Sequence, residues 1–285
     1  MEQKGIERVY RDVEFLTSLR PFRNYLNTDS LNKASHYIYE SFKQYSDCVS
    51  FQEFEAYGNT YRNVLCSINT EKEERIIIGA HYDVAGDTPG ADDNASCIAG
   101  LLEILRLLYD KKTRHRIDFA AYVLEEPPFF GTEKMGSFIH AKSLYENSVK
   151  IKVMISLEMI GFFSDKKNSQ QFPLPFMRLF YPDTGNFIGV VGNTFQRKIT
   201  VRIRDLMRKG SDIPVYSLNA PSIIPGVDFS DHRNFWRFGY NAVMITDTAF
   251  YRNPNYHRRT DTIATLDFDR MYSVIKSVAY AVLNL

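Results

Sequence analysis

Residues 76–100 read IIIGAHYDVAGDTPGADDNASCIAG, and this stretch decides the expected fold. Its three isoleucines lead into Gly-Ala-His, a pattern typical of a buried strand that carries His81 at its carboxyl end. Open α/β sheets bind their ligands at that edge of the sheet. Asp92 and Asp93 follow a Pro-Gly turn and precede an apolar-periodic run, so they lie where a helix begins. A strand end and a helix start can therefore share a cation.

Each of these features also has a purely structural explanation. A histidine at a strand end is more often a hydrogen-bonded structural residue than a ligand. Asp and Asn are favoured helix caps, and most such acidic pairs serve only as caps. Taken alone, His81 and Asp93 leave both interpretations open, and the choice depends on which residues end the other strands.

Length and charge exclude several classes of protein. The chain has 285 residues, enough for one large α/β domain, and we expect residues 1–285 to form a single domain. Lysine and arginine total 35 against 34 acidic residues, which gives a formal net charge of +1. This balance provides no electrostatic reason to expect a nucleic acid or an anionic membrane as partner.

The cysteines and the N-terminal sequence indicate the compartment. Cys48, Cys66 and Cys97 have neither the even count of a disulfide framework nor the paired spacing of a zinc-thiolate site, which favours a reducing environment. The N-terminal residues MEQKGIERVYRDVEFL are charged and amphipathic, unlike a secretory signal. No apolar run approaches the roughly 20 residues that span a bilayer. We expect a cytoplasmic protein, although a secreted chain trimmed of its leader would look the same.

Hydrophobic periodicity predicts an α/β fold in which helices cover a mixed, mostly parallel central sheet. Apolar or alternating runs predict strands at residues 49–54, 63–68, 76–81, 117–124, 152–157, 187–191 and 242–245. Helical spacing predicts helices at residues 6–19, 95–109, 136–144, 194–209 and 268–283, with another that begins near Asp29. Two segments, residues 162–185 and 219–230, show no clear period, and we interpret them as loop insertions that line a cleft.

Polar residues also follow other apolar strands. Glu125 and Glu126 come directly after residues 117–124, Glu158 ends the next apolar run, and His257 lies in the loop after residues 242–245. Several carboxylates around one crevice would raise each other's pKa unless cations neutralised them, and no lysine or arginine is interleaved at these strand ends. A bound metal is the simplest counter-charge.

The donor types indicate which metal is expected. Carboxylate oxygens and imidazole nitrogens without a thiolate suit Zn²⁺, with Mn²⁺ or Co²⁺ as substitutes, and two histidines allow one imidazole for each of two ions. A bridging carboxylate would place the ions about 3.5–4 Å apart, as in two-metal hydrolases. Of the adjacent Glu125 and Glu126, only one readily coordinates, so the other can act as a general base. A merely charged strand terminus is the alternative explanation for this pair.

Several motifs together resemble the M28 family of zinc-dependent aminopeptidases. They are HYD, GADDNAS, LEEPPFFGTEKMGS, SLEMIGFF, GNFIGVVGN and FSDHRNFWRFGYNAVMITDTAFYRNPNYHRRTDT, in the family's order and with similar spacing. The resemblance covers nearly the whole chain, and the joint order is far more specific than any single motif. It implies the zinc exopeptidase fold, with the ligands on loops at the carboxyl ends of the strands.

The resemblance also implies a role for each site residue. It assigns the ligands as follows: His81 and Glu158 to one zinc, Glu126 and His257 to the other, and Asp93 as a bridge between both. Glu125 would then be the general base that activates a metal-bridging water. In such enzymes the peptide bond after the bridging aspartate, here between Asp93 and Asn94, is typically cis.

Three further residues are expected to support the site. Asp83 lies two residues beyond His81 and is placed to accept the second N–H of that imidazole. Tyr256 matches a family tyrosine that steadies the oxyanion, although aromatic packing in a loop explains it equally well. Asp261 is expected to support the loop that carries His257.

The chain departs from the family pattern at three places. Cys97 stands where the family usually has glycine, and Glu158 replaces the aspartate of well-known branches, which weakens any transfer of substrate preference. The segment 127–132 is longer and more apolar than the usual acidic-Gly segment.

The expected reaction is hydrolysis of N-terminal residues from peptides, because a free α-amino group can coordinate zinc and a blocked one cannot. Three alternatives stay open: a glutaminyl cyclase, which shares the fold with a single zinc, a carboxypeptidase of the same family, and an inactive metal-binding homologue. The complete ligand set and an intact Glu125 argue against the inactive homologue. No feature of the sequence indicates an oligomeric state.

Overall fold

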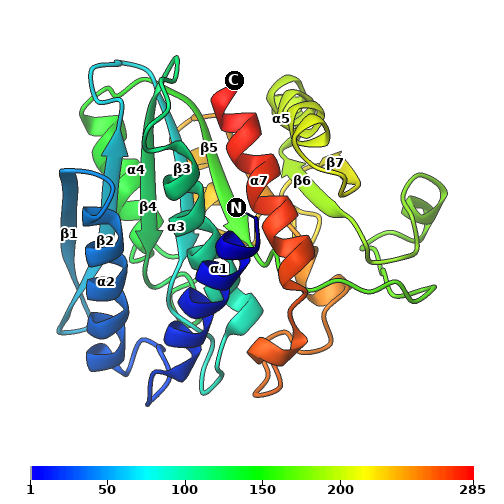
Figure 1. Ribbon diagram of the computed structural model, residues 1–285, viewed down its shortest axis with the longest axis horizontal. Helices are drawn as coiled ribbons and strands as arrows, with labels where there is room; N and C mark the ends of the chain where they lie inside the picture. The colour runs from blue at the N-terminus through cyan, green and yellow to red at the C-terminus, as the bar shows by residue number, and fades with distance from the viewer. Residues whose placement is uncertain (1) are drawn as a thin grey trace.

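The computed structural model describes residues 2–285, and eight strands within that range form one sheet (Figure 1). Their order across the sheet is β1-β2-β4-β3-β5-β8-β6-β7. The strands are β1 (Cys48–Ala56), β2 (Asn59–Ile68), β3 (Arg75–His81), β4 (Arg116–Tyr122), β5 (Ile151–Glu158), β6 (Ile188–Gly192), β7 (Val215–Asn219) and β8 (Ala242–Thr246).

The centre of the sheet is parallel. Strands β4, β3, β5 and β8 run in the same direction, whereas β1, β2 and β6 pair antiparallel with their neighbours β2, β4 and β8. Ile76, Ile77 and Ile78 on β3 are all fully buried, as a parallel strand covered on both faces requires. The predicted mixed, mostly parallel sheet is confirmed.

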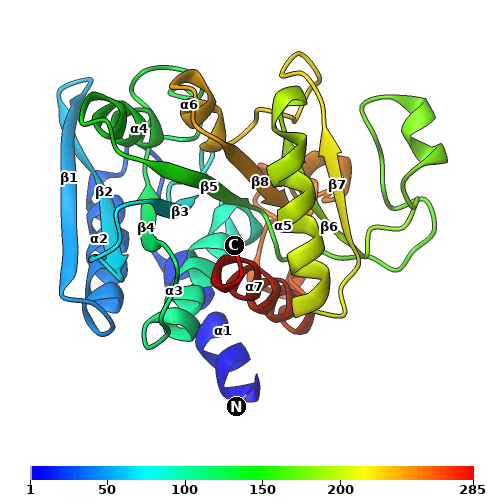
Figure 2. The same cartoon turned by 90° about the horizontal axis from the view of Figure 1, so that it is seen from above.

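Helices cover both faces of this sheet. They are α1 (Glu2–Ser18), α2 (Thr28–Lys43), α3 (Cys97–Leu108), α4 (Gly136–Glu146), α5 (Arg197–Gly210), α6 (His232–Arg237) and α7 (Phe268–Leu283). Seen from above, α4 and α6 lie on one side of the sheet and α1, α3 and α7 on the other (Figure 2). A large apolar cluster packs beneath α1, α2, α3 and α7, and a smaller one beneath α4 and α6. Within residues 2–285 no helix combines the length and apolar character needed to cross a membrane.

Strands β1 and β2 both prove longer than predicted. β2 begins at Asn59, because residues 59–62 pair with the end of β1 across a tight turn. The two turn residues, Tyr57 and Gly58, have positive φ angles of 48° and 78°, the conformation that two-residue hairpins favour. Apolar periodicity does not detect the start of β2, because three of its first four residues, Asn59, Thr60 and Arg62, are polar.

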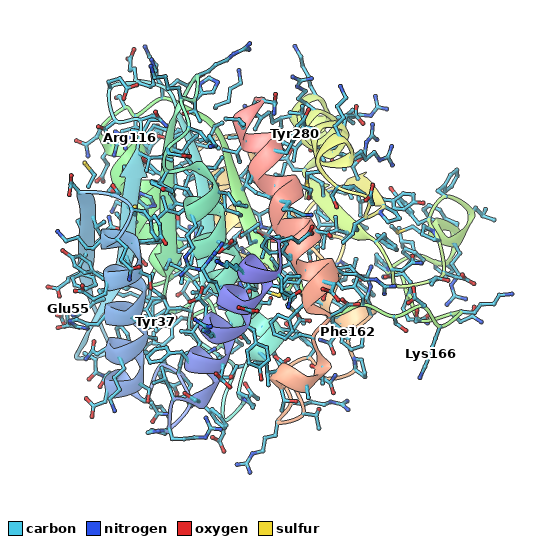
Figure 3. The ribbon with its side chains drawn as sticks, in the orientation of Figure 1. Tyr37, Glu55, Arg116, Phe162, Lys166 and Tyr280 are labelled. Atoms are coloured by element: carbon cyan, nitrogen blue, oxygen red, sulfur yellow. The ribbon has the colours of Figure 1, made fainter. Side chains whose placement is uncertain are left out.

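Residues 162–185 form an irregular excursion whose main regular element is a short 3-10 helix, Pro175–Leu179. Phe162 and Lys166 lie on the side of the molecule opposite Glu55 (Figure 3). Two backbone hydrogen bonds close the excursion, from Ser164 N to Gly185 O and from Gln170 N to Asp183 O, each 2.9 Å long.

Candidate metal centre

The parallel strands bring the predicted ligands to one edge of the sheet. His81 is the last residue of β3, Glu158 is the last residue of β5, and Glu125 and Glu126 follow β4. Because β3, β4 and β5 run in the same direction, their carboxyl ends meet there. Asp93 lies at a kink in the segment Ala91–Ser96, which leads into α3, and its own backbone angles (φ −103°, ψ 87°) are not helical.

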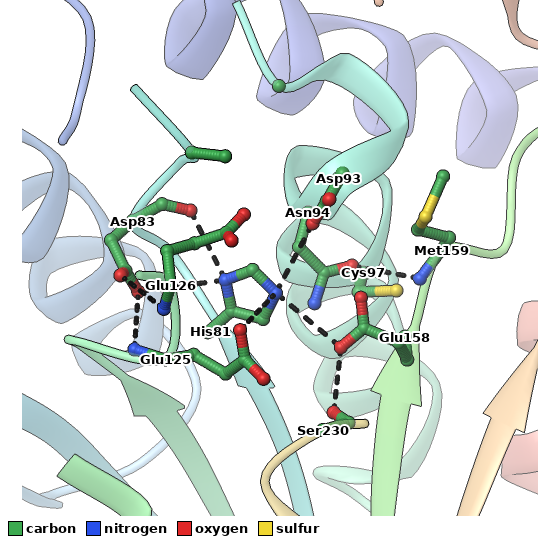
Figure 4. Close-up of polar contacts among 12 residues, drawn as sticks. His81, Asp83, Asp93, Asn94, Cys97, Glu125, Glu126, Glu158, Met159 and Ser230 are labelled. Atoms are coloured by element: carbon green, nitrogen blue, oxygen red, sulfur yellow. Dashed lines mark hydrogen bonds and ion pairs between the residues drawn. The ribbon is translucent and has the colours of Figure 1, made fainter. Parts of the chain in front are cut away.

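The five predicted ligands form two overlapping groups, and Figure 4 shows the group around His81. His81 Nε2 lies 3.4 Å from Asp93 Oδ1 and 3.5 Å from Glu158 Oε2. His257 Nε2 lies 3.1 Å from Asp93 Oδ2 and 3.2 Å from Glu126 Oε2. The two carboxylate oxygens of Asp93 therefore face different histidines, each accompanied by a different glutamate.

Several of the candidate donor atoms are buried and lack hydrogen-bond partners within residues 2–285, as metal ligands would in the absence of the ion. His81 Nε2, Asp93 Oδ1 and Glu126 Oε1 are buried without a hydrogen-bond partner among the described residues. One donor atom from each of these three residues lies within 4.8 Å of the others. Buried polar atoms are almost always satisfied, so unpaired oxygen and nitrogen atoms that converge are the expected lining of a cation site.

Without a metal, the two imidazoles would hold protons. Burial alone lowers the pKa of His81, but the surrounding carboxylates, Glu158 first, raise it well above its ordinary value. Burial also lowers the pKa of His257, whereas its contacts with Asp93 and Glu126 raise it to about 10. Positive charge is thus needed at both positions, and bound metal would supply it in place of the protons.

The carboxylates differ in how firmly they keep their charge. Burial raises the pKa of Asp93, but its contacts with His257 and His81 outweigh this and hold the pKa below its usual range. Burial, followed by the charge of Asp93, raises the pKa of Glu126 to about 7. Asp93 is therefore the carboxylate that stays ionised between the two groups, which suits a bridging position.

Glu125 lies close to the ligands but makes looser contacts. Its Oε2 atom is 3.9 Å from His81 Nε2, farther than the ligand contacts of Asp93 and Glu158. Burial raises the pKa of Glu125 well above its ordinary value; His81 opposes this effect and Glu158 adds to it. A buried carboxylate that binds protons more tightly than usual, and lies farther from the imidazole than the candidate ligands do, suits a general base.

Asp83 orients the glutamates as well as the histidine. Its carboxylate accepts hydrogen bonds from the backbone N–H groups of Glu125 at 3.3 Å and Glu126 at 3.1 Å. The second imidazole nitrogen of His81, Nδ1, lies 3.2 Å from the backbone oxygen of Asp83 and 3.6 Å from its carboxylate. β3 ends at His81, so Asp83 belongs to the following loop and can turn toward β4.

Asp261 connects the loop of His257 to the turn of Asp93. Its carboxylate accepts the backbone N–H groups of Asp92 at 2.9 Å and of Asp93 at 3.1 Å. The Asp93–Asn94 peptide bond is cis, as the family resemblance implies. The Asn94 side chain accepts the backbone N–H of Met159 at 3.0 Å and so joins this turn to the end of β5 (Figure 4).

Left-handed backbone conformations occur next to the ligands. Leu124, which precedes Glu125, has a φ angle of 63°, Met159, which follows Glu158, has 51°, and His257 itself has 55°. Such angles are costly for residues other than glycine and concentrate at functional sites, where surrounding contacts enforce them.

Tyr256 packs beside the metal centre. Its ring stacks on the imidazole of His257 with the centroids 3.8 Å apart, and burial raises its pKa. Tyr256 also lines an adjoining apolar pocket, to which residues 162–185 and the loop before α6 contribute. Glu158, Phe229 and Tyr256 line both this pocket and the cleft that holds the ligands.

Sequence reasoning missed several residues that shape the centre. Ser230 Oγ donates a 2.7 Å hydrogen bond to Glu158 Oε2. The only feature of the sequence that could have drawn attention to Ser230 is that it precedes Asp231. Asp231 is fully buried, and burial raises its pKa to about 7. Arg23, from the loop after α1, donates to the backbone oxygens of Tyr82 and Gly90 at 3.0 and 3.2 Å. No motif pointed to this buried cation near the site.

The comparisons with known proteins agree on a family. The model of peptidase family M28 matches residues 63–282. Uncharacterized protein YfbL of Escherichia coli (strain K12) is 41% identical over 286 residues, which cover 98% of this chain and 88% of that protein. Probable leucine aminopeptidase of Trichophyton verrucosum (strain HKI 0517) is 25% identical over 283 residues, with 93% and 69% covered. The crystal structure of Bacteroides thetaiotaomicron glutaminyl cyclase bound to N-acetylhistamine shares the fold, with a TM-score of 0.74, 18% identity and 98% of both chains covered.

The fold, the cluster of carboxylates and imidazoles and these similarities together define a peptidase of the α/β class. The chain belongs to peptidase family M28. The family predicted from the order of the motifs is therefore confirmed.

Proposed function

We propose that the protein is a di-zinc aminopeptidase that removes N-terminal residues from peptides with a free α-amino group. One observation carries the proposal: the two carboxylate oxygens of Asp93 lie 3.4 Å from His81 Nε2 and 3.1 Å from His257 Nε2. A single ion needs only one such group of donors, whereas a bridging carboxylate between two groups matches a two-metal hydrolase.

Each ion would have its own imidazole and its own glutamate. His81 and Glu158 would hold one zinc and His257 and Glu126 the other, with Asp93 shared; Mn²⁺ and Co²⁺ accept the same donors. Zinc bound there would lower the pKa of water and polarise the scissile carbonyl.

The chemical work of the protein falls chiefly to Glu125. Its buried carboxylate, with a raised pKa, would take a proton from the attacking water and return it to the leaving amine. Asp83 keeps Glu125 in place through its backbone N–H. Tyr256, beside His257, would steady the developing oxyanion.

The apolar pocket supports an N-terminal residue with a large apolar side chain. Its wall includes Met177, Tyr181, Phe187 and Tyr216, and it adjoins Glu158 at the metal centre. A side chain buried there would place its own carbonyl at the ligands, as removal of one residue at a time requires. The name of the Trichophyton verrucosum relative, a probable leucine aminopeptidase, agrees with this preference.

Glutaminyl cyclisation is the second candidate, because a glutaminyl cyclase shares this fold over nearly its whole length. A cyclase with a single zinc would leave one histidine and glutamate pair of the present centre without a role. The two complete donor groups therefore favour the hydrolase.

Three peptides separate the candidates when each is incubated with the zinc-loaded protein. We expect Leu-Gly-Gly to lose its leucine, N-acetyl-Leu-Gly-Gly to stay intact, and a peptide with N-terminal glutamine to be cleaved without cyclisation, as followed by mass spectrometry. Elemental analysis should find two zinc ions per chain. Pyroglutamate formation, release of C-terminal residues or no reaction would contradict the proposal, and would favour the cyclase, the carboxypeptidase or an inactive homologue in turn.

A further inference from the structure

Two phenylalanines form an aromatic wall on the metal cleft. Phe130 lies in the loop after β4, four residues beyond Glu126, and Phe229 lies in the loop between β7 and α6. Their rings meet edge to face, with centroids 5.6 Å apart and an interplanar angle of 71°. Both line the cleft together with Glu125 and Glu126. Phe229 is 41% exposed, so an apolar surface stands open beside the proposed base.

Neighbouring contacts hold the wall in place. The guanidinium of Arg233 stacks on the ring of Phe130 at 4.5 Å and pairs with Asp228 at 3.3 Å. Gly131 has a φ angle of 78°, and a Cβ atom there would lie 3.0 Å from Nη1 of Arg233. Phe130 is therefore a positioned side chain, and the charge of Arg233 is already paired.

The position of Phe130 identifies the part of a substrate that it would meet. Glu158, Phe229 and Tyr256 are shared between the cleft and the apolar pocket, whereas Phe130 and Glu125 line the cleft alone. With the N-terminal side chain in the apolar pocket, the residue after the scissile bond would lie on the side of Glu125, which returns a proton to the leaving amine. That residue would then face Phe130.

We propose that Phe130 and Phe229 select the second residue of the substrate and favour large apolar or aromatic side chains there. This inference rests on the proposed aminopeptidase function. Burying an apolar side chain against two rings removes apolar surface from water. The paired Arg233 offers no free charge to an acidic second residue.

Phe130→Ala tests the inference with three substrates: Leu-Phe, Leu-Gly and leucinamide, which has no second residue. For the wild type we expect kcat/KM to be about tenfold higher for Leu-Phe than for Leu-Gly, a typical size for apolar discrimination. In Phe130→Ala the Leu-Phe to Leu-Gly ratio should fall to within about threefold of unity, since most of the contact that discriminates is gone. Phe229→Ala should lower the same ratio, and supplies a second reading if one variant folds poorly.

Phe195→Ala is the matched control, because Phe195 is 95% exposed on the turn before α5 and lines neither the pocket nor the cleft. It should leave the Leu-Phe to Leu-Gly ratio of the wild type unchanged. If the wild type and both cleft variants share one ratio while all hydrolyse leucinamide, the inference is overturned and the aminopeptidase stands. If the zinc-loaded wild type cleaves none of the three substrates, both proposals are overturned.

Discussion

Replacing Glu125 with glutamine separates the proposed base from the metal ligands. The Glu125 Oε2 atom lies 3.9 Å from His81 Nε2, whereas Glu126 Oε2 lies 3.2 Å from His257 Nε2. Glutamine has nearly the same size and leaves the backbone N–H bond to Asp83 in place. We therefore expect Glu125→Gln to keep its zinc and to lose turnover.

The expected loss follows from the role of a base. A positioned general base contributes about 10²–10⁴-fold to the rate, which corresponds to about 3–5 kcal/mol of the barrier. Asp93, Glu126 and Glu158 face the imidazoles as the proposed ligands, so we expect none of the three to replace Glu125 and the loss to lie toward the upper end of this range. The free energy of unfolding of metal-free Glu125→Gln should not be lower than that of the wild type. The raised pKa of Glu125 means that its ionised form destabilises the metal-free fold above the ordinary pKa, and glutamine removes that charge.

The assay measures kcat with Leu-Gly-Gly and zinc content by elemental analysis, on protein loaded with zinc under identical conditions. Glu126→Gln is the matched control, and it should lose zinc. The reasoning fails if Glu125→Gln keeps more than about a tenth of wild-type kcat, well above the loss expected for a general base. It also fails if Glu125→Gln loses zinc while Glu126→Gln keeps it, since the two glutamates would then have exchanged roles.

Three further outcomes are expected. Zinc affinity, measured by chelator competition at pH 6, 7 and 8, should rise with pH. The pKa of His257 is raised to about 10 and that of His81 is also raised, so zinc must displace a proton from each imidazole at all three pH values, and an affinity that does not change with pH would contradict this. Asp83→Ala should weaken zinc binding about 10–100-fold in the same competition, as loss of a group that orients ligands does, and an unchanged affinity would exclude that role. Arg252→Met should lower the free energy of unfolding in urea by about 1–3 kcal/mol, because it removes the 2.9 and 2.8 Å hydrogen bonds that the buried guanidinium donates to Gln170 Oε1 and to the backbone oxygen of Phe187; a change below about 0.5 kcal/mol, as at a surface position, would contradict this.

Apolar periodicity predicted the elements whose burial is uniform. The helix expected at residues 268–283 matches α7 (Phe268–Leu283), and the strand at residues 242–245 differs from β8 (Ala242–Thr246) by one residue. The start of β2 was missed because its first residues pair at a polar sheet edge. Strand order depends on contacts between distant segments, which periodicity does not encode, and it was not predicted.

Some residues of the candidate site could be predicted from the sequence and others could not. The gathering of the candidate ligands could be predicted, because the carboxyl ends of parallel strands meet at one edge of the sheet and His81 and Glu158 each end such a strand. Arg23 and Ser230 could not, because each acts from a loop whose path is set by tertiary packing. The bonds from Asp83 to the two glutamates were missed for the same reason, since they depend on where the loop after β3 meets the loop after β4.

The sheet order has a consequence for synthesis on the ribosome. β8 lies between β5 and β6 in the middle of the sheet, yet it is the last strand to be made, and His257 follows it. A growing chain thus contains His81 and Glu125 long before His257, which completes the second donor group, has been made. On the proposed assignment, an unfinished chain cannot digest neighbouring nascent peptides, because the centre becomes competent only when the final strand has entered the sheet.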